Sequence, residues 1–532
     1  MRTYSPQQFA DSLKTSHYSD GVTRSMRPGR DGTISVNLAD LTTQEKWLAR
    51  AALGELGQIT GLRFAETAGR AQITYVNDGS GANTRTAASG GTITSATVRI
   101  AASRVEPGDS HGSHAFRTYM HETAHALGLG HPQDYDAVTS FARSAIANDS
   151  WQMSLMSYFD QTENTAVDAT KAYNITPMLA DYVALRQMYD APALHQGHTV
   201  YGVGSTAGGA LDAAARLGAR AAFLVADHSG TDHLNLAGLA AAQRIDLTPG
   251  AISGVMGAVG NMQIAFDTWI ENATGGTGAD GITGNALANR LVGGAGNDTI
   301  QGRGGSDVIE GGAGNDRLWG EDGDDHLSGG AGHDQLRGGA GNDRLIDAGG
   351  ANHLDGGAGN DAITGGIHGD TALGGDGADT IMAGAGNDRV SGGEGSDRLF
   401  GAEGADTIHG GGGHDVISGA AGDDVMTGGA GNDDLAAGMG SDVLDGGLGN
   451  DMMRGGIGRD RFVFNDGLDI IRNFDSAADV IDLRGLAGLD KWSDVDSRLV
   501  QSGNDVLLRH GEDVLRIEWA RLQDLDASDF LW

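Results

Sequence analysis

The spacing of hydrophobic and polar residues divides the chain into three regions. Up to roughly residue 195, apolar positions follow both the helical and the strand period, which is typical of a mixed domain of helices and strands. Residues 196–274 favour short strands, and from Gly275 onward the pattern recurs every nine residues. Because 532 residues exceed the size of an ordinary domain, we expect two or more domains.

Helices are predicted at three places in the first region. Thr42 or Thr43 can cap the first helix. Its apolar face is formed by Trp47, Leu48, Ala51, Leu56 and Ile59. The second helix runs over 115–127 and ends at Gly128, since glycine commonly follows a helix end. Thr176 and Pro177 form the cap and first turn of a third helix that reaches Tyr189.

Strands are predicted where short apolar stretches are bounded by turn residues. In the first region these are 33–38, 62–64, 72–76 and 96–101. In the second region they are 199–201, 222–225 and 244–247. The second region contains no obvious catalytic group.

The third region repeats the unit Gly-Gly-x-Gly-x-Asp-x-apolar-x, as in residues 293–301. The 189 residues 275–463 hold 21 units of nine without a change of register. The eighth position is apolar in every unit, and the sixth is Asp everywhere except at Asn289 and Asn352. A flexible glycine linker would have no phase, and collagen repeats glycine every third residue, so the pattern indicates a solenoid.

Each position of the unit has a physical role. Glycine permits tight turns with positive φ, and the apolar residue points inward from a short strand. Turn carbonyls and Asp carboxylates are hard oxygen ligands, which suit Ca2+. Successive units would stack as a parallel β-roll with two units per coil and about ten coils.

The constant phase of the aspartates distinguishes two interpretations. Residues that only solvate a glycine-rich surface need no fixed position, so the phase favours calcium binding. Because so many carboxylates repel one another, we expect the array to be largely unfolded without metal and to fold where calcium is abundant. The predicted calcium ligands are Asp280, Asp298, Asp307, Asp316, Asp325, Asp334, Asp343, Asp361, Asp370, Asp379, Asp388, Asp397, Asp406, Asp415, Asp424, Asp433, Asp442, Asp451 and Asp460.

A second metal is predicted near residue 121. His121 and His125 are four residues apart, so a helix presents both imidazoles on one face. Gly128 lets the chain turn back, and His131 can then supply a third nitrogen. Three protein ligands leave zinc an open position, which a catalytic site requires. Glu122 would stand beside the metal and take a proton from the activated water.

The segment 154–158 follows the third histidine closely. Met156 can form an apolar floor under the imidazoles, and Tyr158 could reach the metal or donate a hydrogen bond to the oxyanion. By itself a methionine between serines is typical of a packed turn. After three suitably spaced histidines, it supports a catalytic zinc site.

Composition narrows the function classes. The formal charge is 36 − 71 = −35, which argues against nucleic acid as the main partner because phosphate binding needs Lys and Arg. Without cysteine, disulfides and thiolate ligands are excluded. No stretch is long and apolar enough to span a bilayer, and residues 1–13 lack the apolar run of a cleavable secretory signal.

Together these motifs resemble the serralysins, calcium-dependent metzincin proteases that Gram-negative bacteria secrete. The resemblance rests on the zinc motif from His121 to Pro132, on Met156, and on the nonapeptide array. The end of the chain is also similar, at 461–464, 479–483 and 529–532. The array is longer than is typical of the family, and the segments 102–113 and 131–156 are short, which bears on the rim of the cleft.

The resemblance implies an α+β metzincin protease domain followed by an all-β parallel β-roll. It implies a zinc metalloendopeptidase in which His121, His125 and His131 bind zinc, Glu122 is the general base and Tyr158 is a fifth, displaceable ligand. It also implies export to the extracellular space by the type I secretion machinery, through an uncleaved signal at the C-terminus. We expect a monomer that cleaves proteins or peptides.

The expected domains follow the same scheme. They are a short pro-segment at 1–32, the protease domain at 33–195, a strand-rich connection at 196–274 that packs onto the roll, the roll itself at 275–463, and a C-terminal cap with the secretion signal at 464–532.

One alternative function stays open. The long roll could be the functional part of a calcium-dependent surface or matrix protein whose protease domain is accessory or idle. The intact set of His121, Glu122, His125 and His131 favours the protease.

Overall fold

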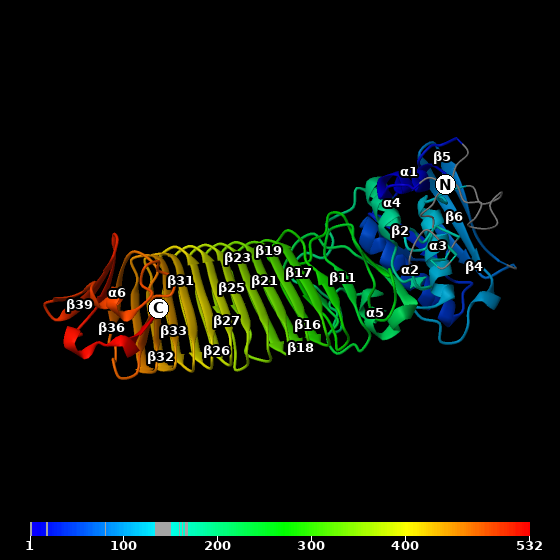
Figure 1. Cartoon of the computed structure of the whole chain (residues 1–532). Helices are drawn as coiled ribbons and strands as arrows, with labels where there is room; N and C mark the ends of the chain where they lie inside the picture. Colours follow the sequence, from blue (N-terminus) through cyan, green and yellow to red (C-terminus); the bar gives the residue numbers. More distant parts are fainter. Residues whose placement is uncertain are drawn as a thin grey trace. The chain divides into compact units, whose positions relative to one another are not determined.

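A computed structural model describes residues 3–16, 20–79, 81–133, 150–158, 160–161, 163–164 and 169–532. The chain divides into two compact units, Met1–Thr283 and Gly284–Trp532. The first mixes helices and strands, and the second is a parallel β-roll, which confirms the predicted fold class (Figure 1). Among the described helices, none is both long and apolar enough to cross a membrane.

The first unit contains the helices α1 (Pro6–Thr15), α2 (Thr43–Thr60), α3 (His114–Leu127), α4 (Leu179–Tyr189) and α5 (Leu211–Leu217). Thr42 caps α2 through a reciprocal pair of hydrogen bonds with Glu45, three residues further on. Trp47 was predicted on the buried face, but its side chain is 39% exposed and its ring lies against His111. The prediction was wrong because Trp47 stands at the margin of the buried stripe, one step of about 100° from Leu48.

The start of α4 also differs from the prediction. The helix begins at Leu179, two residues later than Pro177. The Thr176 hydroxyl accepts the Leu224 N–H (2.7 Å) and is therefore not a cap. The carboxylate of Asp181 takes that role, since it accepts the Met178 N–H at 2.9 Å.

The strands of the first unit are β1 (Ser25–Met26), β2 (Thr33–Asn37), β3 (Arg63–Glu66), β4 (Ile73–Val76), β5 (Ala82–Ser89), β6 (Thr92–Ile100), β7 (Tyr173–Asn174), β8 (Val200–Gly202), β9 (Ala221–Val225), β10 (His233–Asn235), β11 (Arg244–Asp246), β12 (Ile252–Ser253), β13 (Met262–Ile264), β14 (Asn272–Thr274) and β15 (Gly281–Thr283). The main sheet has the order β1-β6-β4-β2-β3, and its strands are parallel. The strand β5 pairs antiparallel with β6. The helix α3 lies against β5 and β6, which brings this hairpin to the predicted zinc helix.

The second unit contains α6 (Trp492–Asp496) and the strands β16 (Arg290–Ala295), β17 (Thr299–Gly304), β18 (Val308–Ala313), β19 (Arg317–Asp322), β20 (His326–Ala331), β21 (Gln335–Ala340), β22 (Arg344–Ile346), β23 (His353–Ala358), β24 (Ala362–Thr364), β25 (Thr371–Asp376), β26 (Thr380–Ala385), β27 (Arg389–Glu394), β28 (Arg398–Glu403), β29 (Thr407–Gly412), β30 (Val416–Ala421), β31 (Val425–Gly431), β32 (Asp434–Gly440), β33 (Val443–Gly449), β34 (Met452–Gly458), β35 (Arg461–Val463), β36 (Leu468–Arg472), β37 (Val480–Asp482), β38 (Leu499–Ser502), β39 (Asp505–His510), β40 (Asp513–Ile517) and β41 (Phe530–Leu531).

These strands form two parallel sheets. Even-numbered strands from β16 to β36 pair in one sheet, and odd-numbered strands from β17 to β37 pair in the other, ending in β41 (Figure 1). Paired residues lie 18 positions apart, as Leu291 and Ile309 do, until β35 pairs with β37 at a step of 19. One coil therefore holds two nonapeptide units, one on each sheet. The strands β38 and β39 are antiparallel, and β40 joins them to β36.

The interior of the roll is built from the eighth position of the unit. All of these side chains are at most 2% exposed, including Ala372, the smallest of them. The first glycine of a unit leaves room for the aspartate of the same unit, because a side chain at Gly311 would collide with the Asp316 carboxylate. The second glycine has a positive φ, as at Gly330 (φ +112°), where a side chain would meet the carbonyl of the preceding coil.

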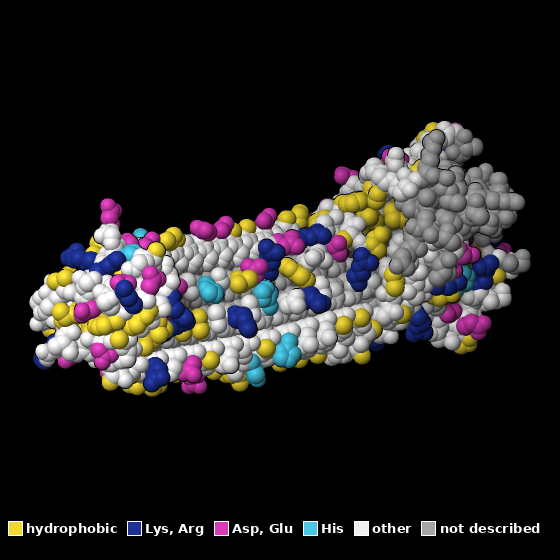
Figure 2. Space-filling model, viewed as in Figure 1, with side chains coloured by type: hydrophobic (Ala, Val, Ile, Leu, Met, Phe, Trp, Pro, Cys, Tyr) yellow, Lys and Arg dark blue, Asp and Glu magenta, His cyan; other side chains and the backbone are white. Residues whose placement is uncertain are grey.

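The surface of the roll carries charges of both signs. Acidic side chains stand on the visible face of the roll together with Arg and His side chains (Figure 2). The repeat aspartates are instead at most 2% exposed. The roll therefore places most of its carboxylates where only a cation, a proton or a backbone N–H can neutralise them.

Candidate metal centre

The helix α3 positions the first two predicted ligands. It begins after Ser113, whose hydroxyl accepts the Phe116 N–H (3.1 Å), and it ends at Gly128 with φ +109°. His121 and His125 lie one turn apart on this helix and are 8% and 7% exposed. Because Gly128 adopts a left-handed conformation, the chain reverses directly after the helix.

The reversal brings His131 to the same point. Its Nε2 atom lies 3.1 Å from Nε2 of His125 and 3.3 Å from Nε2 of His121. Three nitrogens bound tetrahedrally to zinc at the usual bond length lie about 3.3 Å apart. Among the described residues, these histidines form the one group of three or more His, Cys or acidic side chains whose ligand atoms all lie within 4.8 Å of one another. The three imidazoles therefore fit a zinc ion.

Backbone carbonyls orient two of the imidazoles. Nδ1 of His121 lies 3.0 Å from the Leu155 carbonyl, and Nδ1 of His125 lies 2.7 Å from the Leu129 carbonyl. A proton on each Nδ1 leaves Nε2 as the lone-pair donor, the arrangement found in zinc sites. Burial, followed by the nearby charges of His131 and Arg117, holds the pKa of His121 well below its usual range, so this imidazole is neutral.

Glu122 is held next to the histidines by a hydroxyl from the strand β5. Its carboxyl is 5% exposed, and Oε2 lies 2.8 Å from the Thr84 hydroxyl, which is also 2.8 Å from the Glu122 carbonyl. Burial raises the pKa of Glu122 to about 7, against the opposing effects of Thr84 and the charge of Arg104. A carboxyl with this pKa can take up and release a proton near neutral pH.

The segment with Met156 is fixed by two buried charged residues. Arg117, one turn before His121, donates to the carbonyls of Leu155 (2.9 Å) and Ser157 (2.7 Å). The Asp181 carboxylate accepts the Leu155 N–H at 2.7 Å, and burial raises the pKa of Asp181 to about 6. The backbone N–H and the backbone carbonyl of Leu155 are thus both held, and the carbonyl orients His121. Met156 itself is fully buried.

Tyr158 borders the three histidines from this segment. Its ring centroid lies 4.6 Å from that of His131 and 6.0 Å from that of His121. The side chain is 54% exposed, so the phenol stands between the histidines and solvent. The structure therefore brings together all five residues predicted to take part in zinc binding or catalysis, namely His121, Glu122, His125, His131 and Tyr158.

Three supporting residues were missed by the sequence analysis. Arg117 offered a signal, because it precedes His121 by four residues and so shares its helix face. Thr84 and Asp181 offered none, because only the tertiary fold brings them to Glu122 and Leu155.

The repeat aspartates share one geometry. One carboxylate oxygen, Oδ1, accepts the backbone N–H of the aspartate 18 residues earlier, as Asp316 does from Asp298 (2.8 Å). The second oxygen, Oδ2, is buried without a hydrogen-bond partner among the described residues in most units. This holds for Asp307, Asp316, Asp325, Asp334, Asp343, Asp361, Asp379, Asp388, Asp397, Asp406, Asp415, Asp424, Asp433, Asp442, Asp451 and Asp460.

These carboxylates fit a cation better than they fit one another. Burial, together with the charges of neighbouring aspartates, raises the pKa of Asp316 to about 6 and that of Asp424 to about 7. A buried oxygen without a donor is costly, and hard oxygen ligands of this kind suit Ca2+.

A few units depart from this geometry. Both oxygens of Asp280 and of Asp370 accept backbone N–H groups, so these two carboxylates have less free capacity for a metal. In one of the two units that lack the sixth-position Asp, Asn352 keeps the ladder bond to the Asp334 N–H (3.0 Å). Asp347 replaces the first glycine of that unit and is 1% exposed. Burial raises the pKa of Asp347 to about 8, and Asp334 adds to this shift.

Two further ladder members lie beyond the repeats. Asp469 and Asp479 accept the N–H groups of Asp451 (2.9 Å) and Asp460 (3.0 Å). The sequence analysis missed Asp469, although it keeps the nonapeptide register, because residues 464–472 lack the leading glycines of the unit. It missed Asp479 because this residue follows Asp460 by 19 positions instead of 18.

Comparison with known proteins bears on both kinds of site. Residues 192–346 match the family Peptidase M10 serralysin C terminal. The RTX calcium-binding nonapeptide repeat matches 337–372, 364–399, 373–408, 400–435 and 436–471. The resemblance to the serralysins is confirmed. The array is accordingly an RTX calcium-binding repeat.

Individual relatives are metalloproteases. Metalloprotease AprA from Pseudomonas entomophila (strain L48) is 37% identical over 188 residues, which are 34% of this chain and 39% of that protein. Serralysin B from Dickeya chrysanthemi is 38% identical over 177 residues, 32% of this chain and 36% of that protein. Serralysin from Proteus mirabilis is 39% identical over 184 residues, 34% of this chain and 37% of that protein. The matched part thus spans less than two fifths of the length of each of these curated relatives.

Among solved structures, the extracellular lipase LipA from Serratia marcescens matches over 46% of this chain and 45% of that chain. The sequence identity is 14% and the TM-score is 0.15, so this likeness carries no argument about fold or activity.

Proposed function

We propose that this chain is a secreted, calcium-stabilised zinc metalloendopeptidase that hydrolyses peptide bonds in proteins. The observation that carries the proposal is the convergence of His121, His125 and His131 with Nε2 separations of 3.1 and 3.3 Å beside the buried carboxyl of Glu122. The metalloprotease relatives support the same reading.

The chain's own residues divide the work of hydrolysis. A zinc ion held by the three histidines would supply a Lewis acid for the scissile carbonyl and for the attacking water. Glu122 takes the proton from that water and passes it to the nitrogen of the leaving amine, which its pKa near 7 allows. The Tyr158 hydroxyl, at the exposed side of the histidines, donates a hydrogen bond to the oxyanion. Met156 packs below the site as its apolar support.

Calcium in this proposal is structural. The repeat aspartates supply carboxylate ligands in the turns between strands, and bound Ca2+ replaces the repulsion between neighbouring carboxylates with attraction. The roll then folds outside the cell, where calcium is abundant. We propose the protease domain at 33–195, the roll-packing connection at 196–274, the roll at 275–463, and a cap at 464–532 that contains a type I secretion signal.

The experiment that tests this function is digestion of casein by full-length protein loaded with zinc and calcium. Wild type is expected to cleave casein, and Glu122→Gln, which keeps the shape of the side chain, is expected to lose at least a hundredfold in kcat. The zinc content of both proteins, measured by mass spectrometry, controls for loss of the metal.

Zinc-loaded wild type without activity on any protein substrate would overturn the proposal. That result would favour the alternative of a calcium-dependent surface or matrix protein with an idle protease domain.

A further inference from the structure

The helix α1 takes no part in the proposed chemistry, yet it is bonded to the turn that carries His131. The Gly130 N–H donates to the Leu13 carbonyl (2.7 Å), and the Ser12 hydroxyl donates to the Pro132 carbonyl (2.5 Å). The Ser16 hydroxyl donates to the carbonyl of His131 itself. Three consecutive residues of the turn are thus tied to one end of α1.

The bonds come from one face of the helix end. Ser12 and Ser16 are four residues apart, so both hydroxyls point the same way. The Leu13 carbonyl belongs to the last turn of α1, where carbonyls have no partner within the helix. The turn therefore donates a hydrogen bond to a carbonyl at the end of α1, and α1 in return fixes the backbone of the turn.

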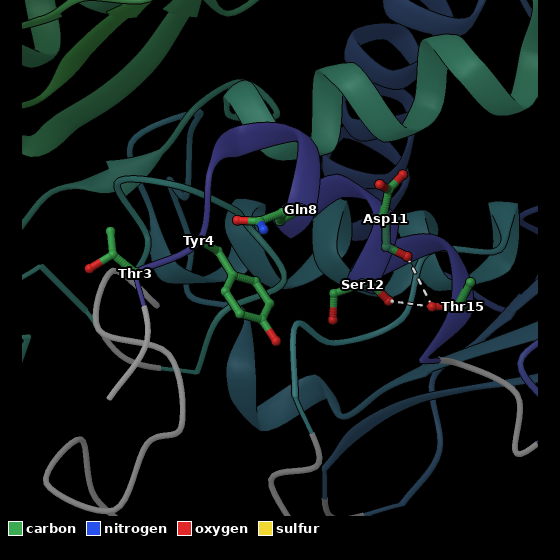
Figure 3. Close-up of a pocket in the computed structure, with 6 residues that line it drawn as sticks. All are labelled: Thr3, Tyr4, Gln8, Asp11, Ser12 and Thr15. Carbon is green, nitrogen blue, oxygen red and sulfur yellow. Dashed lines mark hydrogen bonds between the residues drawn. The ribbon is translucent and has the colours of Figure 1, made fainter.

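The helix is itself anchored in the first unit. Phe9, Ala10 and Leu13 are fully buried, and α1 packs against α4. The Lys14 ammonium donates to the Gln187 side chain of α4 at 2.6 Å. The helix also borders a surface hollow lined by Thr3, Tyr4, Gln8, Asp11, Ser12 and Thr15 (Figure 3).

The chain after α1 supports the same turn from a second direction. The Tyr189 hydroxyl donates to the Leu127 carbonyl (2.6 Å) and accepts the Met26 N–H (2.9 Å). A side chain at Gly128 would collide with the Arg24 carbonyl, so the backbone at Arg24 packs directly on the reversal. One end of the turn is thus held by α1, and the other by Tyr189 of α4 and by the backbone at Arg24.

We propose that α1, with Ser16, is a positioning element that holds His131 in place for zinc, and that it stays with the mature protein. The sequence analysis expected residues 1–32 to be a short pro-segment. A segment that buries three apolar side chains and bonds to the ligand turn is instead part of the site's support. This inference rests on the zinc site of the proposed function.

The coupling works in both directions. A helix of ten residues is marginal on its own, so α1 depends on its contacts for stability. By thermodynamic linkage, if α1 strengthens zinc binding, bound zinc stabilises the docked α1 by the same free energy. Zinc loading is therefore expected to slow amide hydrogen exchange in residues 6–15.

The main test is zinc affinity, measured by chelator competition on full-length, calcium-loaded protein. Ser12→Ala/Ser16→Ala is expected to weaken zinc binding about tenfold, the lower end of the effect of supporting residues. Alanine favours the helix more than serine does, so helix propensity does not account for a loss. His131→Ala shows how far zinc affinity falls when the third ligand is removed completely.

The matched control is Thr15→Ala. The Thr15 hydroxyl turns back to the carbonyls of Asp11 and Ser12 within its own helix (Figure 3). This variant is expected to bind zinc as wild type does. Equal affinity in the double-serine variant and wild type would overturn the inference, whereas wild type that binds no zinc would refute the zinc site itself.

A second measurement addresses processing. The mass of the secreted, active protein is expected to include residues 5–16. An active form that begins after Ser16 and binds zinc as tightly as the longer chain would also overturn the inference.

Discussion

The proposed zinc centre, called the zinc centre below, and the calcium roll bring metal ligands together in opposite ways. At the zinc centre each ligand has its own support: Leu155 for His121, Leu129 for His125 and α1 for His131. In the roll each carboxylate has the same support, the N–H group of the coil before it. One site is built from unique contacts, and the other from one contact repeated.

The difference extends to charge. Burial holds the pKa of His121 well below its usual range, and its Nε2 lies 3.3 Å from that of His131. The repeat carboxylates are buried with an oxygen that has no donor, so they need a cation or a proton to be stable. We therefore expect the zinc centre to be preformed and the roll to be formed by its metal.

Calcium removal gives the largest expected effect. A calcium chelator added to the full-length protein is expected to abolish most of the β-sheet signal in circular dichroism and to expose residues 284–471 to trypsin. Removal of zinc alone with a zinc-selective chelator serves as the control and should leave that signal intact. A roll that resists trypsin equally with and without calcium would break the comparison.

Acid is expected to replace calcium in part. Burial is the main reason that the pKa of Asp316 is raised from an ordinary 3.8 to about 6 and that of Asp424 to about 7. Between pH 3.8 and these raised values, the folded roll therefore binds more protons than the unfolded chain. The stability of the calcium-free roll is therefore highest near pH 4 and falls as the pH rises to about 7. Circular dichroism of calcium-free protein should show more sheet at pH 5 than at pH 8, a difference that saturating calcium reduces. More sheet at pH 8 than at pH 5 would contradict the raised pKa values of the buried carboxylates.

Thr84 tests the unique contacts of the zinc centre. Thr84→Val keeps the shape and the strand propensity but loses the hydroxyl that holds Glu122, so kcat is expected to fall about tenfold with little change in KM. Thr84→Ser keeps the hydroxyl and is expected to stay within about twofold of wild type. Steady-state kinetics on a peptide substrate, with zinc content measured in parallel, checks this. If valine and serine act alike, the hydroxyl has no role.

A single repeat aspartate gives the smallest expected effect. Asp406→Asn can keep the ladder bond to the Asp388 N–H, as Asn352 does for Asp334, and loses only one charge. Its melting temperature with calcium is expected to drop by a few degrees. Asp406→Ala also loses the ladder bond, so its free energy of unfolding is expected to be lower than that of Asp406→Asn by about 1 kcal/mol. Calorimetry distinguishes the two. An asparagine variant that fails to fold would mean that the units are not interchangeable.

The roll was predictable because its sequence is periodic. Every eighth-position side chain, down to Ala372, is buried as expected, and the two-unit coil follows from the register of Leu291 with Ile309. The histidines were predictable because a helix fixes the spacing of His121 and His125. Neither argument depends on distant parts of the chain.

The missed features all depend on tertiary contacts. Thr84 lies on β5, whose small and polar side chains gave no strand pattern. Thr176 was predicted to cap a helix, but its hydroxyl accepts a hydrogen bond from the Leu224 N–H instead. The helix α1 has a good capping signal at Ser5 and Pro6, but only the fold shows that it meets the turn at His131.

The 18-residue register gives the roll a fixed step of length. One added coil extends both sheets by a single strand, roughly 4.8 Å, and leaves every later residue on its own sheet. A single added nonapeptide would instead move all later strands to the opposite sheet. The end of the chain, where β40 joins β36 and β41 joins β37, would then meet the wrong partners. Such a roll can gain or lose length during evolution only in pairs of units, while its terminal strands remain unchanged.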